Sequence, residues 1–528
     1  MENKTEIVSI NIQNDDDQNG TLWNEMGRRN EYTKISCMPH IKNLDEFYKG
    51  VYEYFNNKGI VCIITKNIID LFILGFTILF SSFILFYFDW NELMRCNSEE
   101  TCHHITHYIR TPSYTSAYAV VIALYFSTLS VFWCWKLIYF VHNVPRYYET
   151  YSFVKYVIQI PTNGLETIKW DAIVQKMITL NSEQQFQFSS PVDAKDIACR
   201  IMRVDNYIIS MFEHNIIPTN TCCGDKHFTK HVEWLFRIAL FDKLFKNNYT
   251  IDKNMLKDTS SIVFNFKLIA MLNFLFMPFI VLFMIIHFCF KNVENFHQSR
   301  DALGLRDWSN IAKWKFRKYN ELSHVFDLRM NMSYDVANDY IKQFNYSLNI
   351  ILAKGVSFIA GSFLGLFLLF GLLDENIPLY IEFFGRNLFW HIAILSGVVA
   401  ACRTFIPKRK YTVFNPDTAM NKIIQYTNYQ TIDDCRCYKE MNRLLSFYPF
   451  KVMLLWHEIK SIILTPYLFG FVYVKHIDKI ITFIRQHTVH IHGLGDICKS
   501  SQLDVSNSYK IKSSIISFRS EHASWTTD

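Results

Sequence analysis

The 528-residue sequence contains little glycine and proline, 17 and 12 residues respectively, which excludes fibrous and low-complexity classes. Charged residues make up only 19% of the chain, whereas a soluble enzyme carries roughly 25%. The net charge of 54 − 48 = +6 is small and spread out, so nucleic acid is not expected as a partner. Residues Met1–Glu6 hold no apolar core of a signal peptide, and membrane insertion would therefore use internal segments.

The sequence also lacks recognisable catalytic motifs. It has no glycine-rich phosphate loop and no nucleophile elbow, so we expect neither an enzyme nor a bound cofactor. One spacing resembles a metal site, formed by Cys222, Cys223, His227 and His231, because histidines four residues apart on a helix can share an ion. Adjacent cysteines are an unusual ligand pair, and we interpret them as reduced thiols in a helical cytosolic region. No metal is predicted.

Apolar and aromatic side chains, by contrast, are abundant. Hydrophobic residues make up 50% of the chain, and there are 46 Phe, 29 Tyr and 11 Trp. Six apolar segments stand out: Leu71–Phe88, Ser116–Trp135, Leu268–Phe290, Gly355–Leu373, Asn387–Cys402 and Ser461–Val474. A helix that crosses the bilayer core needs about 20 residues. Because Pro278 interrupts the third segment and the sixth is short, we predict four spanning helices and two re-entrant segments.

The placement of charge predicts the orientation of these helices. Acidic residues dominate the loop between the first two spans and the loop between the last two, whereas Lys and Arg flank both pairs on the outside. Since positive flanks face the cytosol, both short loops are expected in the lumen and both termini in the cytosol. Leu268–Phe290 must then enter and leave the membrane on one face, which a bend at Pro278 permits.

Together these features predict an all-α polytopic membrane protein, with four transmembrane helices, two membrane-dipping helical segments and a helical cytosolic domain. The predicted order is a disordered cytosolic tail (1–43), the first transmembrane pair with its luminal loop (44–143), a cytosolic helical region (144–260), a membrane-dipping segment (261–290), cytosolic helices (291–354), the second transmembrane pair (355–405), cytosolic helices with a re-entrant segment at 461–474 (406–505), and a disordered C-terminal tail (506–528).

Polar residues in apolar surroundings are the candidate functional groups. Lys267 and Asn273 lie at the start of and within Leu268–Phe290, and Arg403 ends the Asn387–Cys402 span. Ionisable groups at membrane depth cost energy and usually face a cavity or one another. Lys267 and Arg403 are therefore either interfacial anchors or part of a wet path for a charged headgroup or an ion.

Two further features leave alternatives open. Cys96 and Cys102 both fall in the first luminal loop, where an oxidising lumen would allow a disulfide, or they remain two free thiols. Ser357, Gly361 and Gly365 form a small-residue stripe along one span. Such a stripe lets a neighbouring helix approach closely, either within one subunit or between subunits.

Several longer strings are similar to those of a known family. They are Asn43–Phe55, Ala302–Arg306, Tyr319–His324, Leu352–Gly355, Ala360–Ser362, Cys402–Pro407, Thr465–Pro466 and Gly493–Asp496. In this order, over roughly residues 43–505, the chain resembles the autophagy-related protein nine family of integral-membrane lipid scramblases. The resemblance implies four spanning helices, two membrane-dipping segments and a homotrimer with a polar cavity through which phospholipids change leaflet without energy input.

The resemblance also implies partners, locations and further site residues. A lipid-transfer protein would deliver phospholipid, and other autophagy factors would bind the cytosolic surface. The protein would reside in the preautophagosomal structure and in Golgi-derived and endosomal vesicles. Glu321 and His324 match the family's Asn-Glu-Leu motif and are expected near the cytosolic mouth of the lipid path. The alternatives are an ion or solute channel or transporter, and a membrane scaffold that recruits autophagy factors without scrambling.

Overall fold

The computed structural model describes residues 43–94, 104–109, 117–160, 164–182, 193–219, 227–245, 249–298, 306–344, 347–374, 377–406, 414–504 and 508–525. The fold in these ranges is almost entirely helical, as predicted. Residues 1–42, Cys96, Cys102, Cys222 and Cys223 lie outside them.

Six apolar helices hold all or part of the six apolar segments of the sequence. They are α3 (Ile60–Phe86), α5 (Ala117–Ser152), α12 (Ser260–Gln298), α15 (Ser347–Leu373), α17 (Leu388–Phe405) and α20 (Lys451–Tyr467). By length and composition, five stretches could cross a membrane, and the last of these runs from α20 to the end of α21. Helix α17 is shorter than these five stretches, and its apolar part is Leu388–Arg403.

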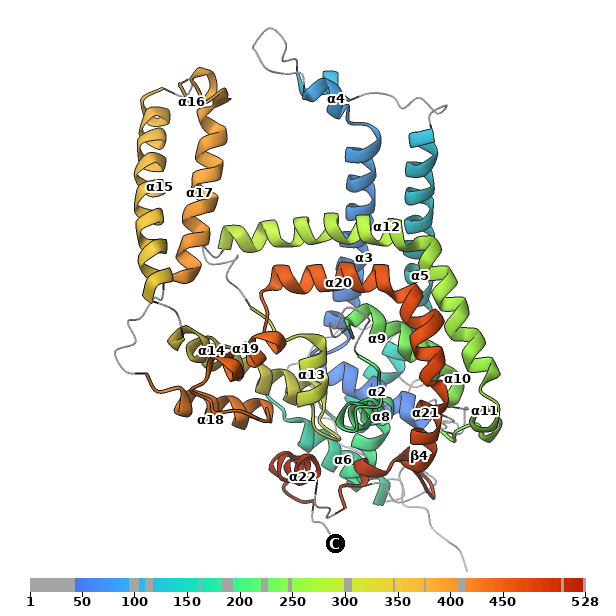
Figure 1. Ribbon diagram of the computed structural model, residues 1–528. Coiled ribbons are helices and arrows are strands. Elements are labelled where there is room, and N and C mark those ends of the chain that lie inside the picture. Colours follow the sequence, from blue (N-terminus) through green and yellow to red (C-terminus); the bar gives the residue numbers. More distant parts are fainter. Residues whose placement is uncertain are drawn as a thin grey trace, which may run out of the picture.

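Most of the other elements form a helical body at one end of these helices, together with one small hairpin (Figure 1). The body helices are α2 (Leu44–Asn56), η2 (Phe153–Val157), α6 (Trp170–Ser182), α7 (Ala194–Ile201), α8 (Arg203–Glu213), α9 (Lys230–Phe236), η4 (Arg237–Phe241), α10 (Asp242–Leu244), α11 (Lys253–Lys257), α13 (Asn310–Phe316), α14 (Ser323–Gln343), α18 (Pro416–Thr427), α19 (Tyr438–Phe447), η6 (Leu468–Val472), α21 (Tyr473–Gln486), η7 (Lys499–Gln502) and α22 (Tyr509–Glu521). Antiparallel strands β3 (Thr488–Ile491) and β4 (Gly495–Cys498) complete it.

The two short loops lie at the end of the molecule away from the body (Figure 1). One holds α4 (Trp90–Leu93) and η1 (Ile105–Tyr108). The other holds α16 (Ile377–Tyr380) and the antiparallel pair β1 (Glu382–Phe383) and β2 (Arg386–Asn387). This shared location is what the charge pattern requires, because both acidic loops were expected on one side of the membrane.

Two of the apolar helices change direction. Figure 1 shows α3, α5, α15 and α17 running roughly parallel, while α12 and the helix from α20 into α21 each bend, so that one part runs across the others. Pro278 lies near the middle of α12, and Pro466 lies next to the π-helical turn η6. Proline and π-turns are the usual causes of sharp helix bends, because both interrupt the ladder of backbone hydrogen bonds.

The boundaries of the second bent segment differ from the prediction. The apolar run Ser461–Val474 is the end of a helix that begins at Lys451, and the bend falls inside the run. Charged Lys451, Glu458 and Lys460 break up the apolar pattern of α20. A search for uncharged runs therefore finds only the last part of this helix.

The predicted disorder of the C-terminal residues is wrong for most of the segment. Residues Tyr509–Glu521 form helix α22, which buries Ile515 and Phe518 against the body. Trp525 joins the same core, with its ring 4.9 Å from that of Phe518. The segment looks polar in sequence because only one narrow face of the helix is apolar.

The helix pair α3 and α5 shows how closely the apolar helices approach. Gly75 of α3 faces Trp133 of α5, whose Nε1 would lie 3.1 Å from an added Cβ. The same Nε1 donates a hydrogen bond of 2.9 Å to the carbonyl of Leu71. Past the bend, α12 packs Phe279 and Phe283 against the cluster that these two helices form.

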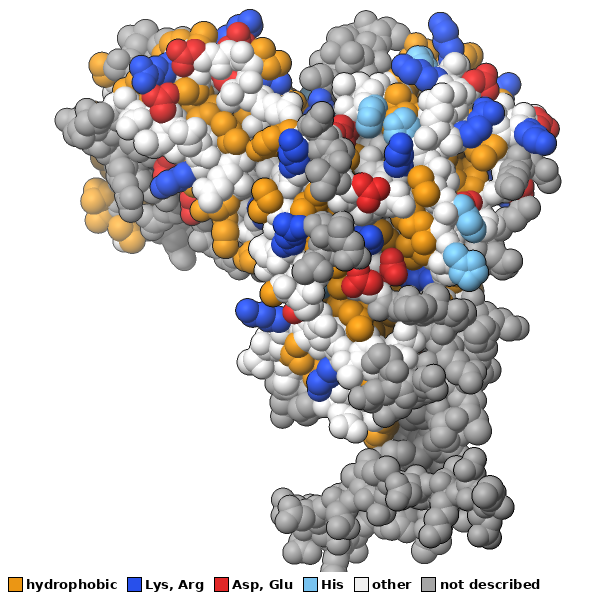
Figure 2. All heavy atoms as spheres, turned by 90° about the horizontal axis from the view of Figure 1, so that it is seen from below, with side chains coloured by type: hydrophobic (Ala, Val, Ile, Leu, Met, Phe, Trp, Pro, Cys, Tyr) orange, Lys and Arg blue, Asp and Glu red, His pale blue; other side chains and the backbone are white. Residues whose placement is uncertain are grey.

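The face of the body opposite the apolar helices is polar. Seen from below, acidic, basic and histidine side chains are interspersed with small hydrophobic areas (Figure 2). The apolar helices, by contrast, expose large side chains such as Phe72, Phe274 and Phe358. This division matches a molecule with one end in water and the other in lipid.

Candidate lipid path

The most unusual polar contact lies on the apolar helix α12. Asn273 is buried, and its Nδ2 lies 2.9 Å from Nε2 of His231 on α9. An amide NH2 group can only donate a hydrogen bond, so the imidazole accepts it and is neutral. Burial lowers the pKa of His231 to about 4, which agrees with a neutral ring.

This contact leaves one polar atom of Asn273 without a partner. Its Oδ1 is buried and has no hydrogen-bond partner in the described part of the chain. If the amide were turned over, Nδ2 would be left without a partner instead. Asn265, two turns earlier on α12, also has a buried Nδ2 that no described residue accepts. Unpaired polar atoms of this kind cost about 1–3 kcal/mol each unless water or a ligand satisfies them.

A cavity lies between α20 and the residues just before α9, where Thr229 in its wall is two residues from His231. Its volume is about 490 Å³, and its walls come from α9, α13, α19 and α20. His457 and Glu458 of α20 contribute polar groups to it. Glu458 Oε1 accepts a 3.2 Å hydrogen bond from the backbone N–H of Lys230.

Hydrogen bonds connect the cavity wall to the base of α9. Thr229, which also lines the cavity, has its Oγ1 2.8 Å from Oγ of Ser461 on α20. His231 follows two residues later on α9. Polar groups therefore extend from the cavity at Glu458 to Asn273 on α12, although both helices expose apolar side chains elsewhere.

The two predicted cations are exposed, and the structure gives them no partner. Lys267 lies on α12 before the bend, at an exposed position between buried Phe266 and Ala270. Arg403 lies in the last turn of α17. Neither side chain has a hydrogen bond or an ion pair within the described ranges. Both guanidinium and ammonium groups therefore remain able to receive a phosphate.

Glu321 has a different position from the one expected. It is buried, and its two carboxylate oxygens accept hydrogen bonds of 2.8 Å each from Nε and Nη2 of Arg329. The same carboxylate accepts the backbone N–H of Lys318 at 2.9 Å. In this conformation Glu321 has no free oxygen to offer a headgroup, and we assign it a structural role in the body.

His324 is also held inside the body. Its Nδ1 lies 3.0 Å from the hydroxyl of Tyr52 on α2, and its ring contacts Phe55. Burial, and to a lesser degree the charge of Lys58, lowers the pKa of His324 to about 4. The structure thus groups His324 with α2, and not with Lys267, Asn273 or Arg403.

Comparison with known sequences and folds decides the family. A family model described as "Autophagy protein ATG9" matches residues 36–504. The chain belongs to the ATG9 family. It is 28% identical to autophagy-related protein 9 of Arabidopsis thaliana, over 92% of this chain and 62% of that protein. It is also 28% identical to the Dictyostelium discoideum protein, over 97% of this chain and 77% of that protein.

A solved ATG9-family structure has the same fold. The cryo-EM structure of Schizosaccharomyces pombe Atg9 superposes with a TM-score of 0.66 at 26% identity, covering 88% of this chain and 99% of that one. The chain spans about half the length of other relatives, such as 48% of the Saccharomyces cerevisiae protein.

Sequence reasoning singled out one of the two residues in the Asn273–His231 contact. Asn273 was predicted because an amide inside an apolar run is visible in the sequence. His231 was considered only as a metal ligand, since its distance from Asn273 along the chain hides the contact. Glu458 and Thr229 carry no sequence signal of their own, because the cavity that they line is formed by four helices from separate parts of the chain.

Proposed function

We propose that this chain is an energy-independent phospholipid scramblase that moves lipids between leaflets while the autophagosomal membrane expands. Membership of the ATG9 family supports the autophagic setting, and the buried Asn273–His231 pair on an apolar helix supports a polar path. A headgroup that crosses about 30 Å of hydrocarbon loses its hydration. A groove with polar atoms to replace water removes much of that cost, and no covalent step is needed.

In this proposal the headgroup moves along α12. Lys267 and Arg403 receive its phosphate at the cytosolic edge, because charge-assisted hydrogen bonds to phosphate are strong and the arginine fork fits its oxygens. The unpaired amide atom of Asn273 then replaces one hydration contact farther along α12. The cavity beneath α20, with Glu458 in its wall, gives the headgroup an aqueous exit.

We further propose that four helices (α3, α5, α15 and α17) cross the membrane and that the bent parts of α12 and α20 lie along its cytosolic face, with both termini cytosolic. The working unit is a homotrimer. The pair α15 and α17 stands apart from the other helices (Figure 1), and an added Cβ at Gly361 or Gly365 would meet nothing within 4 Å. An open stripe of this kind favours contact with a second copy over packing within the subunit.

The partners and locations of the proposal follow from the family. A lipid-transfer protein would deliver phospholipid to the cytosolic leaflet, and this chain would equalise the two leaflets. It would be carried on Golgi-derived and endosomal vesicles to the preautophagosomal structure, where other autophagy factors bind its cytosolic body.

Reconstitution into liposomes separates the proposed function from its alternatives. Purified protein is inserted into vesicles that carry a fluorescent phospholipid in both leaflets and an ion-sensitive dye inside. The proposal predicts that a membrane-impermeant quencher bleaches nearly all of the lipid fluorescence, whereas about half survives in empty vesicles because only the outer leaflet is reached. Ion flux without lipid exposure would identify a channel or transporter instead. If folded protein gave neither lipid exposure nor ion flux, the result would favour a scaffold role.

A further inference from the structure

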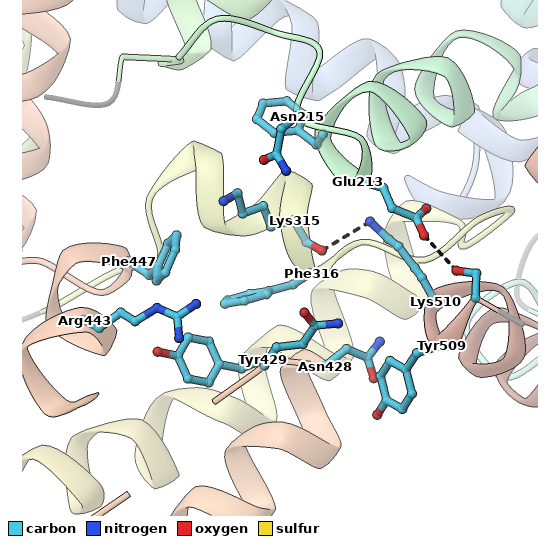
Figure 3. A pocket seen from close by; sticks show the side chains of 13 residues that line it. Glu213, Asn215, Lys315, Phe316, Asn428, Tyr429, Arg443, Phe447, Tyr509 and Lys510 are labelled. Carbon is cyan, nitrogen blue, oxygen red and sulfur yellow. Dashed lines mark hydrogen bonds between the residues drawn. The ribbon is translucent and has the colours of Figure 1, made fainter. Parts of the chain in front are cut away.

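A second cavity lies in the body, where α8, α13, α18, α19 and the start of α22 meet. Its volume is about 270 Å³. Aromatic side chains form much of its wall, and they are Phe212, Phe316, Tyr429, Phe447 and Tyr509. The close-up in Figure 3 shows Phe316 and Tyr429 side by side with polar side chains around them. None of its lining residues belongs to the proposed lipid path, except that Phe447 also borders the cavity beneath α20.

Three basic side chains face this cavity, and they come from three different helices. They are Lys315 of α13, Arg443 of α19 and Lys510 of α22. Glu213 is the one acidic residue in the lining. Its oxygens are already engaged, because Oε2 accepts a 2.5 Å hydrogen bond from Tyr319 and Oε1 one of 2.8 Å from Ser508. The cavity therefore carries an excess of positive charge.

Two hydrogen-bond donors in the cavity wall are buried without an acceptor. Nη1 of Arg443 has no hydrogen-bond partner among the described residues, although it forms an ion pair with the carboxylate of Glu440 at 3.6 Å. Nδ2 of Asn428 has none either, although its Oδ1 accepts a hydrogen bond from Ser513 at 3.3 Å. Buried donors are nearly always satisfied in native proteins, so an unsatisfied pair indicates a missing acceptor.

The ammonium group of Lys510 is buried in the cavity wall, where a counter-ion would stabilise its charge. Its Nζ donates to the backbone carbonyl of Lys315 at 3.3 Å, which does not neutralise it. Burial lowers the pKa of Lys510 to about 8, against the opposing effect of Glu213. An anion in the cavity would stabilise the ammonium form.

We propose that this cavity binds a small phosphate-bearing ligand, in which the phosphate accepts hydrogen bonds from Arg443, Lys510 and Asn428 and a ring of the ligand packs against Phe316 and Tyr429. Arginine presents a planar fork that matches phosphate oxygens, and lysine adds a point charge. The volume of about 270 Å³ accommodates a phosphorylated sugar or polyol ring or a mononucleotide, but no large polymer. The phosphate comes either from a soluble compound or from the headgroup of a phosphoinositide.

Calorimetric titration of the full chain in detergent tests this proposal without any scrambling measurement. The probes are inorganic phosphate, adenosine monophosphate, inositol trisphosphate and a short-chain phosphatidylinositol bisphosphate. We expect saturable binding of at least one phosphorylated ring compound, tighter than that of inorganic phosphate. Tighter binding of the lipid than of inositol trisphosphate would point to a membrane headgroup, and the reverse order to a soluble ligand.

Two variants test whether the ligand binds in this cavity. Arg443→Gln removes the charge and should weaken binding about tenfold, the usual effect of losing one charge-assisted hydrogen bond. Asn428→Asp is nearly isosteric and keeps an acceptor for Ser513, but it adds a negative charge next to the phosphate. It should weaken binding at least as much. Lys512→Gln, an exposed position on α22, is the control and should leave the affinity unchanged.

The absence of saturable binding of every probe at millimolar concentration would overturn the proposal. So would binding that both cavity variants leave unchanged. Because Asn428→Asp preserves size and Oδ1, a failure of Arg443→Gln to fold would still leave one decisive variant. Retained scrambling in a chain that has lost phosphate binding would show that the two sites act separately.

Discussion

Nδ2 of Asn273 and Nε2 of His231 lie 2.9 Å apart, and this polar contact joins the apolar helix α12 to α9 of the body. Asn273 is buried, and its second amide atom has no hydrogen-bond partner among the described residues. If the hydrogen bond to His231 were the whole role of Asn273, the side chain would not need a second, unpaired amide atom. In the proposed path, a passing headgroup interacts with this atom.

The first prediction concerns the two exposed cations of the proposed lipid path. Replacing Lys267 and Arg403 together with Leu should slow scrambling about tenfold, because two charge-assisted contacts to the phosphate are lost. Thermal unfolding should change little, since neither side chain has a partner in the described structure. The charge-preserving pair Lys267→Arg and Arg403→Lys is the control. Normal rates in a folded double-Leu variant would reduce both residues to membrane anchors.

Glu321 should behave as a structural residue. Glu321→Gln leaves Arg329 buried without its counter-ion, and breaking such a pair costs about 3–5 kcal/mol. We expect a much lower thermal unfolding midpoint in detergent, partly restored by the double variant Glu321→Leu and Arg329→Met. Removing the exposed ion pair with Asp417 through Arg436→Gln should lower the midpoint much less, because solvent screens it,. If Glu321→Gln left the unfolding midpoint unchanged but slowed scrambling, Glu321 would have a role in lipid movement and not a structural role.

The Glu321 case shows what a motif match can and cannot predict. Six apolar helices and the bend at Pro278 followed from hydropathy and from proline chemistry, which are local properties of the sequence. The partners of Glu321 and His324 depend on Arg329 and Tyr52, which no periodicity identifies. Helix α22 was missed because its apolar face is narrow. Ile515 and Phe518 stabilise the helix only by packing against the body, and the sequence does not show that contact.

Stability should fall as the pH is lowered from about 7 to 4. The pKa of His324 is about 4 in the folded protein and about 6.5 when unfolded. The unfolded state therefore binds a proton first, and stability present at pH 7 is lost on acidification. For His324, which is partly open to solvent, the loss is on the order of 1–2 kcal/mol.

His324→Gln should flatten this dependence when the unfolding midpoint is measured across the same pH range. The exposed His142 offers a matched control, since His142→Gln should leave the slope unchanged. A slope that His324→Gln does not alter would mean that another group controls the acid sensitivity.

The open stripe on α15 should matter for assembly and not for the folding of one chain. Gly361→Leu with Gly365→Leu adds bulk where the single chain has free space. If a second copy packs there, trimer association should weaken about tenfold. Mass photometry in detergent measures the populations, with Ser362→Leu on the adjoining face as the control. A full trimer population in the glycine variant would place the contact elsewhere, and monomers alone in the unmodified protein would refute the trimer.

The most direct test of the central claim is the lipid exposure rate of Asn273→Leu in liposomes. Leucine matches asparagine in size, and it removes both amide atoms from the middle of α12. The account predicts a rate at least about tenfold lower, with an unfolding midpoint close to that of the unmodified protein, while Met271→Leu at an exposed position of the same helix scrambles normally. An Asn273→Leu protein that is folded and exposes lipid at the original rate would contradict the proposed path.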